Sequence, residues 1–156
     1  MSLYVIVLIF SREIRLKKCP IGIPTNDNFE LVEVQVPDPN DGEFLVRNIW
    51  MSVDPYMRGR MTERKSCVPP CELGKPLDGA CIGKVVESKN NQFAVGDYVL
   101  GTNGWREYWK SAGSGNSGAT KIDSTLGPYS ILPRNIWDAG THSIYWPAKN
   151  WPTQRR

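Results

Sequence analysis

The sequence has almost no histidine and no long apolar run, and both shortages exclude classes of protein. His142 is the only histidine among 156 residues, whereas zinc requires three or four ligands drawn mainly from histidine and cysteine. The apolar run Met1–Phe10 is too short for a membrane-spanning helix. No basic residue precedes this run and no small-residue cleavage site follows it, so it lacks the form of a signal peptide.

An excess of one charge is also missing. The net charge is only +3 and the basic residues are scattered, which argues against a nucleic-acid-binding surface in spite of a pI near 8.7. The hydrophobic fraction of 40% and the charged fraction of 22% are typical of one globular domain. We therefore expect a cytoplasmic protein with neither a nucleic-acid nor a membrane partner.

Cysteine is scarce as well. The four cysteines are Cys19, Cys67, Cys71 and Cys81. An even number fits a disulfide framework, but no other feature argues for secretion. The C-x3-C spacing of Cys67 and Cys71 is compatible with a metal, yet too few further ligands are present to complete a site. We expect no metal site.

Helical periodicity is absent from Arg12 to Ser130, so this region is expected to be built from strands. Turn residues separate segments of about five to eight apolar, β-branched and aromatic residues, which predicts a mainly β fold, a small barrel or sandwich. Gly79 and Gly83 fall inside one of these segments, where glycine is expected only if another group must approach closely. The predicted strands are Arg12–Leu16, Phe29–Val36, Glu43–Met51, Leu77–Ser88, Val95–Leu100 and Trp105–Trp109.

The segment Arg47–Met61 carries the most informative pattern, RNIWMSVDPYMRGRM. Its first half favours a buried strand. Asp54-Pro55 ends that strand, because proline fixes φ and donates no hydrogen bond. A short helical turn with a tyrosine and two arginines is expected next, at a strand end where loops commonly carry function. The alternative is that Tyr56 and Met57 only pack under the turn and that the arginines are solvated.

The segment SVDPYMRGRM resembles the signature of the zinc-independent medium-chain dehydrogenase/reductases, the branch with prostaglandin reductases and alkenal double-bond reductases. The similarity runs from about Arg12 to Ser130 and includes IGIPTNDNFELVEVQVP, GKPLDGACIGKVVES, FAVGDYVLGTNGWREYW and TKIDSTLGP. It implies a GroES-like, partly open β-barrel with short helical turns, and no zinc. It also implies a second, Rossmann domain that holds NADP(H), for which this chain is too short.

The same resemblance implies roles for individual residues. The tyrosine of the D-P-Y-M-R motif, Tyr56 here, faces the substrate cleft in related double-bond reductases, where a phenol can donate a hydrogen bond to a carbonyl oxygen. Arg58 is the candidate for balancing cofactor phosphate, with a bracing or solvated arginine as the alternative. Some plant relatives have a second tyrosine where Ala80 stands here, so their substrate set does not transfer directly.

Two glycine motifs are expected to be structural. The segment Gly113–Gly118 matches G-x-G-x-x-G, but a dinucleotide fingerprint requires a following helix, and ATKIDSTLGP has no apolar helical face. We therefore interpret it as a flexible loop. In GDYVLG, glycine permits a tight turn and Asp97 is expected to bind nearby backbone amides.

The tail from Ile131 does not continue the family pattern. A shift of the reading frame by one base turns each tryptophan codon into the start of a glycine codon, so Trp137, Trp146 and Trp151 become the glycines that the family has at this spacing. We interpret the tail as frameshifted. The expected parts are an apolar extension over residues 1–11, a GroES-like domain over 12–123, and a linker with a poorly ordered tail over 124–156.

The functional hypothesis is a truncated NADP(H)-dependent reductase of enals and enones that is inactive without its cofactor domain. Two alternatives remain open. One is a non-catalytic β-barrel module that forms a homodimer or binds a full-length paralogue. The other is a small secreted or membrane-associated β protein built on the Met1–Phe10 run.

Overall fold

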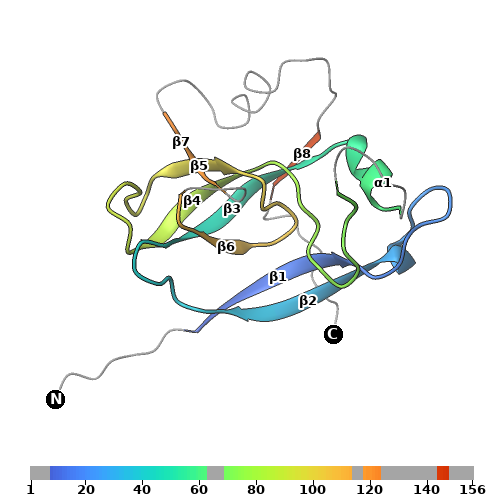
Figure 1. Ribbon diagram of the computed structural model, residues 1–156, viewed down its shortest axis with the longest axis horizontal. Helices are drawn as coiled ribbons and strands as arrows, with labels where there is room; N and C mark the ends of the chain where they lie inside the picture. Colours follow the sequence, from blue (N-terminus) through green and yellow to red (C-terminus); the bar gives the residue numbers. More distant parts are fainter. Residues whose placement is uncertain (1–7, 63–68, 114–117, 124–143, 148–156) are drawn as a thin grey trace.

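The computed structural model describes residues 8–62, 69–113, 118–123 and 144–147, and these form two antiparallel sheets with one short α-helix. Figure 1 shows the smaller sheet, β1 and β2, lying against one side of the larger one. The elements are β1 (Ile9–Leu16), η1 (Asn26–Asn28), β2 (Phe29–Val36), β3 (Phe44–Val53), α1 (Tyr56–Arg60), β4 (Cys81–Ser88), β5 (Tyr98–Gly101), β6 (Tyr108–Ser111), β7 (Thr120–Ile122) and β8 (Ile144–Pro147).

The smaller sheet is a ribbon of β1 and β2, whose register runs from Ile9↔Val36 to Leu16↔Phe29. The bounds of β2 are those predicted from its alternating pattern. β1 begins at Ile9, three residues before the predicted start, so the end of the apolar N-terminal run belongs to the sheet. Ser11 is fully buried there, and its hydroxyl accepts a hydrogen bond from the Tyr108 N–H at 3.1 Å.

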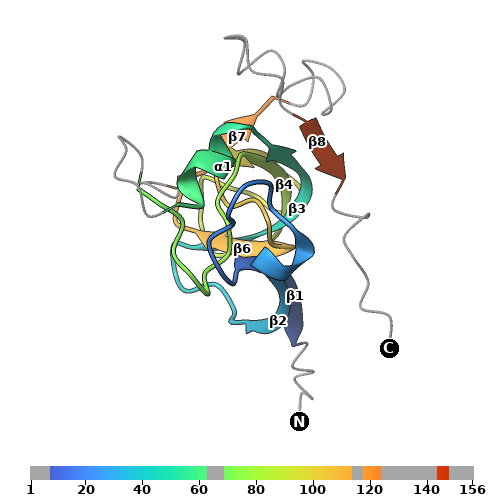
Figure 2. The same ribbon diagram turned by 90° about the vertical axis from the view of Figure 1, so that its right-hand side faces the viewer.

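The larger sheet has the strand order β6-β3-β4-β5-β7, and β8 pairs with β3 outside this path. β3 is its centre. β4 pairs with β3 along most of its length, β6 pairs with Phe44–Arg47, and β8 pairs with Trp50–Val53. Two different strands therefore share one edge of β3, and Figure 2 shows β8 at the side of β3.

Two apolar clusters stabilise this arrangement. The first lies between the sheets and includes Phe44, Val46 and Trp109, with the Phe44 and Phe93 rings stacked at 4.3 Å between centroids. The second lies under α1 and contains Leu16, Met57, Met61 and Leu77. The fold is mainly β with no closed barrel among the described residues, which confirms the predicted partly open, GroES-like architecture with short helical turns.

Several strand ends differ from the predictions. β4 begins at Cys81 instead of Leu77, because Gly79 leaves the ladder to pair with Asn103. β6 begins at Tyr108 instead of Trp105, because Trp105 has a φ of 61°, which no strand accommodates. β7 lies beyond the last predicted strand, and β8 lies in the part expected to be a poorly ordered tail; the rest of residues 124–156 is outside the described residues.

Gly83 is the interior glycine with the clearest packing reason. A Cβ atom on Gly83 would lie 2.3 Å from Val46 Cγ1 and 2.8 Å from the Arg47 carbonyl oxygen. β3 and β4 thus approach each other more closely at this point than any side chain on Gly83 permits. This confirms the expectation that a close approach explains a glycine in the strand.

The two sheets are joined by a charged pair. The carboxylate of Glu107 accepts hydrogen bonds from the Arg12 backbone N–H and from Arg12 Nε, each at 3.0 Å, and forms an ion pair with Arg12 Nη2. Burial raises the pKa of Glu107, but the hydrogen bonds and charge of Arg12 outweigh burial and leave this pKa lowered. Arg12 belongs to β1 and Glu107 directly precedes β6, so the pair fastens the ribbon to the larger sheet.

Candidate functional site

The candidate site is built on α1, which begins directly after β3 ends. Asp54-Pro55 stops the strand as predicted, and the Met57 N–H closes the first turn on the Asp54 carbonyl at 3.1 Å. Met57 points into the core with 4% exposure, whereas Tyr56 keeps 51% of its surface exposed. The turn therefore uses Met57 as its anchor and presents the Tyr56 phenol at the surface.

The Tyr56 hydroxyl lies in a mixed electrostatic environment. Partial burial raises its pKa above the ordinary value of 10.0, the negative charge of Asp54 raises it further, and Arg60 opposes both. The phenol is therefore protonated at neutral pH. A protonated phenol on a rigid strand end can donate a hydrogen bond to an acceptor on a bound molecule.

Arg58, the other residue proposed from the sequence, is directed at backbone carbonyls. Its Nη2 donates to Gly22 O at 2.7 Å and to Pro20 O at 3.1 Å, and its Nε donates to Gly22 O at 3.0 Å. These contacts brace the loop between β1 and β2 against α1. They support the bracing alternative, while the role toward a cofactor phosphate stays a prediction.

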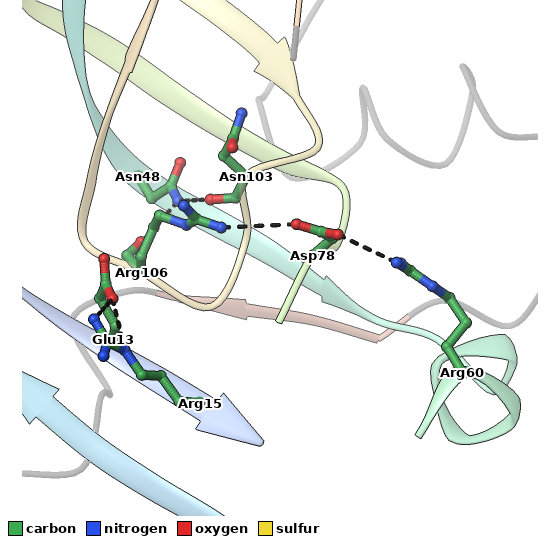
Figure 3. A network of polar contacts seen from close by, with 7 residues as sticks. All are labelled: Glu13, Arg15, Asn48, Arg60, Asp78, Asn103 and Arg106. Carbon is green, nitrogen blue, oxygen red and sulfur yellow. Dashed lines mark hydrogen bonds and ion pairs between the residues drawn. The ribbon is translucent and has the colours of Figure 1, made fainter. Parts of the chain in front are cut away.

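Arg60 belongs to a chain of charges that sequence reasoning did not single out (Figure 3). Its Nη2 lies 3.2 Å from one carboxylate oxygen of Asp78, and Arg106 Nη2 lies 3.7 Å from the other. The two arginine side chains are only 14% and 19% exposed, whereas that of Asp78 is 53% exposed. Asp78 thus lies at the surface between two largely buried guanidinium groups.

The loop that carries Arg106 packs tightly on Gly79. The Gly79 N–H donates to Thr102 O at 3.0 Å, and the Gly104 N–H donates to Gly79 O at 2.9 Å. A Cβ atom on Gly79 would lie 2.5 Å from Met57 Cε and 3.3 Å from Trp105 Nε1. Because Gly79 has no side chain, Met57 and the indole of Trp105 can both pack directly against its backbone.

Several buried polar atoms near Gly79 have no hydrogen-bond partner. Among the described residues, five buried side-chain atoms have none, and all belong to residues 52–54 or 103–106: Ser52 Oγ, Asp54 Oδ1, Asn103 Nδ2, Trp105 Nε1 and Arg106 Nε. The two segments flank residues 79–80, since the Ser52 N–H donates to Ala80 O at 2.8 Å and Gly79 pairs with Asn103. Such atoms are uncommon in native proteins, and an ordered water, a bound ion, local strain or a catalytic role can account for them.

Asn48 holds the loop at residues 103–106 from the side of β3. Its buried amide donates to Asn103 O and to Arg106 O, each at 2.8 Å, and its Oδ1 accepts from Trp109 Nε1 at 2.8 Å. No local pattern in the sequence distinguishes this asparagine, because its partners lie more than 50 residues away. Asp78 and Arg106 escaped prediction because their ion pairs also join segments that are distant in the sequence.

The described residues do not form a metal or dinucleotide site of a familiar kind. They contain no group of three or more histidine, cysteine, aspartate or glutamate side chains placed to hold a metal; Cys67 lies outside them. Downstream of the glycine-rich segment Gly113–Gly118 comes the strand β7, not a helix, so no helix N-terminus is offered to a pyrophosphate there. Within the part of the chain that the structure describes, no helix is long and apolar enough to span a membrane.

Comparison with known proteins identifies the family. Residues 12–119 match the family model described as the N-terminal domain of oxidoreductase. The chain belongs to this family. This oxidoreductase N-terminal domain is 43% identical over 94 residues to the NADPH-dependent curcumin reductase of Escherichia coli, an alignment that covers 60% of this chain and 27% of the reductase.

Two further relatives agree with this assignment. The NADP(+)-dependent 2-alkenal reductase of Nicotiana tabacum is 34% identical over 103 residues, which cover 63% of this chain and 30% of that protein. The crystal structure of CurA from Vibrio vulnificus superposes with a TM-score of 0.72 at 35% identity, covering 79% of this chain and 35% of CurA. The oxidoreductase N-terminal domain thus spans about a third of the length of the relatives that it matches.

Proposed function

We propose that this chain is the substrate-side part of an NADP(H)-dependent reductase that acts on the activated carbon–carbon double bond of enals and enones. The observation that carries the proposal is the Tyr56 phenol, which is half-exposed, protonated at neutral pH and held just after the end of β3 in a segment that resembles the signature of such reductases. Reduction at the β carbon of an enone moves negative charge onto its carbonyl oxygen. A hydrogen bond from Tyr56 stabilises this charge as it develops.

The groups around Tyr56 suit this role. Met57 is locked in the core, so the backbone that carries the phenol is held rigidly. Arg60 adds positive charge on the side where an oxyanion forms, with Asp78 as its counter-charge.

The cofactor is expected to be NADP(H), held by a part of the enzyme outside the described residues. The relatives that match are NADP-dependent by name, but the glycine-rich segment here leads into β7 and not into a phosphate-binding helix. Holding both reactants together supplies a large part of the rate of a two-substrate reaction. This chain by itself is therefore proposed to be inactive.

The first experiment tests that inactivity. Purified chain is mixed with NADPH and a simple enone such as 3-buten-2-one, and the absorbance of the reduced nicotinamide is followed. We expect no decrease beyond the rate without protein, and no heat of NADPH binding in calorimetry. Turnover, or tight NADPH binding by this chain, contradicts the proposed loss of activity.

The second experiment tests Tyr56 itself. Residues 12–119 replace the matching region of the E. coli curcumin reductase, and Tyr56→Phe is introduced into this chimera. We expect kcat to fall by roughly 10²-fold, as for loss of one donor to an oxyanion. Tyr108→Phe is the control, since Tyr108 lies on β6 with Arg47 over its ring, away from α1. Equal kcat values for the two variants contradict the role of Tyr56.

A further inference from the structure

Asn103 is the only asparagine in the chain that is followed by a glycine. In an Asn-Gly pair the backbone nitrogen of the glycine can attack the side-chain carbonyl carbon of the asparagine, because glycine gives the backbone the freedom to bring these atoms together. The reaction is spontaneous and converts the amide to a carboxylate. Asn103 and Gly104 therefore form a chemically labile point in the loop that carries Arg106.

The packing of this loop requires the glycine that makes the pair labile. Gly104 is buried, and a Cβ atom on it would lie 2.9 Å from the carbonyl oxygen of Gly79 and 3.3 Å from its carbonyl carbon. These are backbone atoms, which cannot move aside as the tip of a side chain can, so a larger residue at position 104 would push the loop away from Gly79. The labile pair is thus a necessary part of the loop.

The backbone on both sides of Asn103 is held by three hydrogen bonds, which we call the Gly79 clasp. The Gly104 N–H donates to Gly79 O at 2.9 Å, and the Gly79 N–H donates to Thr102 O at 3.0 Å, which together pair Asn103 with Gly79. The Asn103 carbonyl accepts from Asn48 Nδ2 at 2.8 Å. Attack requires the Gly104 nitrogen to lose its proton and to turn toward the Asn103 side chain. The closed clasp opposes both steps, because this N–H is engaged and the backbone cannot rotate without breaking the three bonds.

The side-chain amide of Asn103 contributes nothing to this protection. Its Nδ2 is buried without a hydrogen-bond partner among the described residues. Figure 3 shows the amide directed away from the contact between Arg106 and Asp78. Departure of the NH2 group therefore breaks no hydrogen bond, and the barrier that the fold adds to the reaction resides in the clasp alone.

We propose that Asn103 is a deamidation site that reacts only when the Gly79 clasp opens. In the open loop the Gly104 nitrogen gives up its proton and attacks Asn103 Cγ, so that a C–N bond forms. The bond from Cγ to Nδ2 breaks, and ammonia leaves with a proton from solvent. Water then opens the resulting succinimide ring at one of its two carbonyl carbons and yields either aspartate or isoaspartate.

The isoaspartate product holds the loop open. It adds one carbon atom to the main chain between residues 103 and 104, so the Gly104 N–H and the Asn103 carbonyl cannot both return to Gly79 and Asn48. The reaction thus makes a transient opening permanent, in the loop that carries Arg106 to Asp78. It needs only water and does not depend on the proposed reductase function.

The test compares the full chain in native buffer and in concentrated guanidinium chloride at the same mildly alkaline pH. Peptide mapping in a mass spectrometer follows aspartate and isoaspartate at position 103. We expect the reaction in denaturant and a rate roughly tenfold or more lower in the native chain. Hydrogen exchange at the Gly104 N–H, measured by NMR, gives the fraction of open clasp, and the native rate should equal the denatured rate multiplied by this fraction.

Three results overturn the proposal. They are equal rates in the native and denatured samples, no reaction at Asn103 in denaturant, and slow native deamidation although the Gly104 N–H exchanges freely. Asn103→Gln confirms the assignment if it abolishes the product in denaturant.

A pair of variants separates opening of the clasp from general unfolding. Asn48→Ala removes the donor to the Asn103 carbonyl and should raise the native rate by roughly fivefold, as for loss of one hydrogen bond that holds the closed loop. Asn28→Ala is the matched control, because Asn28 is also buried, and its amide bonds to Lys18 O at 3.3 Å and to the Thr25 N–H at 2.8 Å, away from the clasp. Equal acceleration by both folded variants would contradict the clasp. If Asn48→Ala does not fold, the comparison of deamidation with hydrogen exchange in the parent chain decides.

Discussion

At the scale of single residues, α1 shows how two arginines in one short helix act differently. Arg58 directs its planar fork at the carbonyls of Pro20 and Gly22 and so fixes a loop. Arg60 lies between the Pro69 carbonyl and Asp78 and adds charge near Tyr56. Lysine cannot replace the bidentate geometry at Arg58, since its single ammonium group presents no fixed fork.

Gly83 allows a sharp test of packing at the residue scale. We expect Gly83→Ala to lower the free energy of unfolding by about 2 kcal/mol, because the added methyl group meets the Arg47 carbonyl and Val46 at distances that the paired strands cannot relax. Urea unfolding followed by circular dichroism measures the change.

Gly59→Ala is the matched control for that variant. Gly59 lies in α1, and nothing is found within 4 Å of a Cβ atom placed on it. This substitution should be neutral or stabilising by up to about 1 kcal/mol, as expected for alanine in a helix. Equal destabilisation by both variants would rule out the close approach of β3 and β4 as the cause.

Local chemistry was predictable at this scale, whereas partners distant in sequence were not. The stop at Asp54-Pro55 and the hydrogen bond from the Ala94 N–H to Asp97 at 2.8 Å follow from neighbouring residues. The position of Asn48 between Trp109 and the loop at residues 103–106 depends on the assembled sheet. No pattern within either segment encodes that contact.

At the scale of elements, the ribbon of β1 and β2 is attached to the larger sheet by polar groups as well as by the core. Arg12 and Glu107 make the charged contact, and the Ile14 N–H donates to Trp105 O at 2.9 Å nearby. One edge of β1 thus pairs with β2, and the other edge contacts residues 105–107, which directly precede β6. Loss of Glu107 should loosen the whole ribbon and not one side chain only.

Glu107→Gln tests this attachment through its pH dependence. The folded-state pKa of Glu107 is lowered, so its stabilising effect is fully present above its unfolded pKa of about 4.3 and is lost as the pH falls through the folded value. We expect the variant to be about 1–2 kcal/mol less stable than the parent at neutral pH, with the difference shrinking as acid protonates the Glu107 carboxylate of the folded parent.

Thermal unfolding at a series of pH values provides the measurement. Glu72→Gln is the control, because Glu72 lies in an exposed loop where only its backbone carbonyl is engaged, by the Lys75 N–H. It should follow the pH profile of the parent. A constant difference between Glu107→Gln and the parent from pH 7 to pH 3 would contradict the electrostatic origin.

A strand in which apolar and polar residues alternate could be predicted from the sequence. A strand that exists only because a neighbouring strand pairs with it could not. β2 alternates clearly and its bounds were predicted without error. β7 has three residues and exists because Tyr98–Leu100 of β5 offers an edge to it. The start of β6 depends on the backbone of Trp105, whose positive φ is imposed by the packing of its loop on Gly79.

At the scale of the whole molecule, β3 organises the larger sheet, and β8 covers the half of its edge that β6 leaves open. An uncovered edge presents free N–H and C=O groups and invites pairing between molecules. The expected boundary at residue 123 separates the two sheets from this covering strand. It remains a prediction that residues 12–123 form an independent unit.

Removal of residues 124–156 tests that boundary. We expect the shortened chain to keep its β-sheet circular dichroism, because β1 to β7 and the apolar clusters found among the described residues lie before residue 124. We also expect it to associate as concentration rises, since Trp50–Val53 loses its partner. Size-exclusion chromatography with light scattering gives the mass, and Val53→Lys in the shortened chain should restore the monomer. An unfolded product would mean that the tail is integral to the domain.

The position of β3 also has a consequence for synthesis on the ribosome. Each strand that pairs with β3 lies later in the chain, and β6 is completed only at Ser111. A nascent chain that has exposed β3 must therefore carry that apolar strand without a partner until β4 has emerged, and with one edge unpaired until β6 is completed, although β1 and β2 are already able to pair. This interval is when the emerging protein depends most on chaperones.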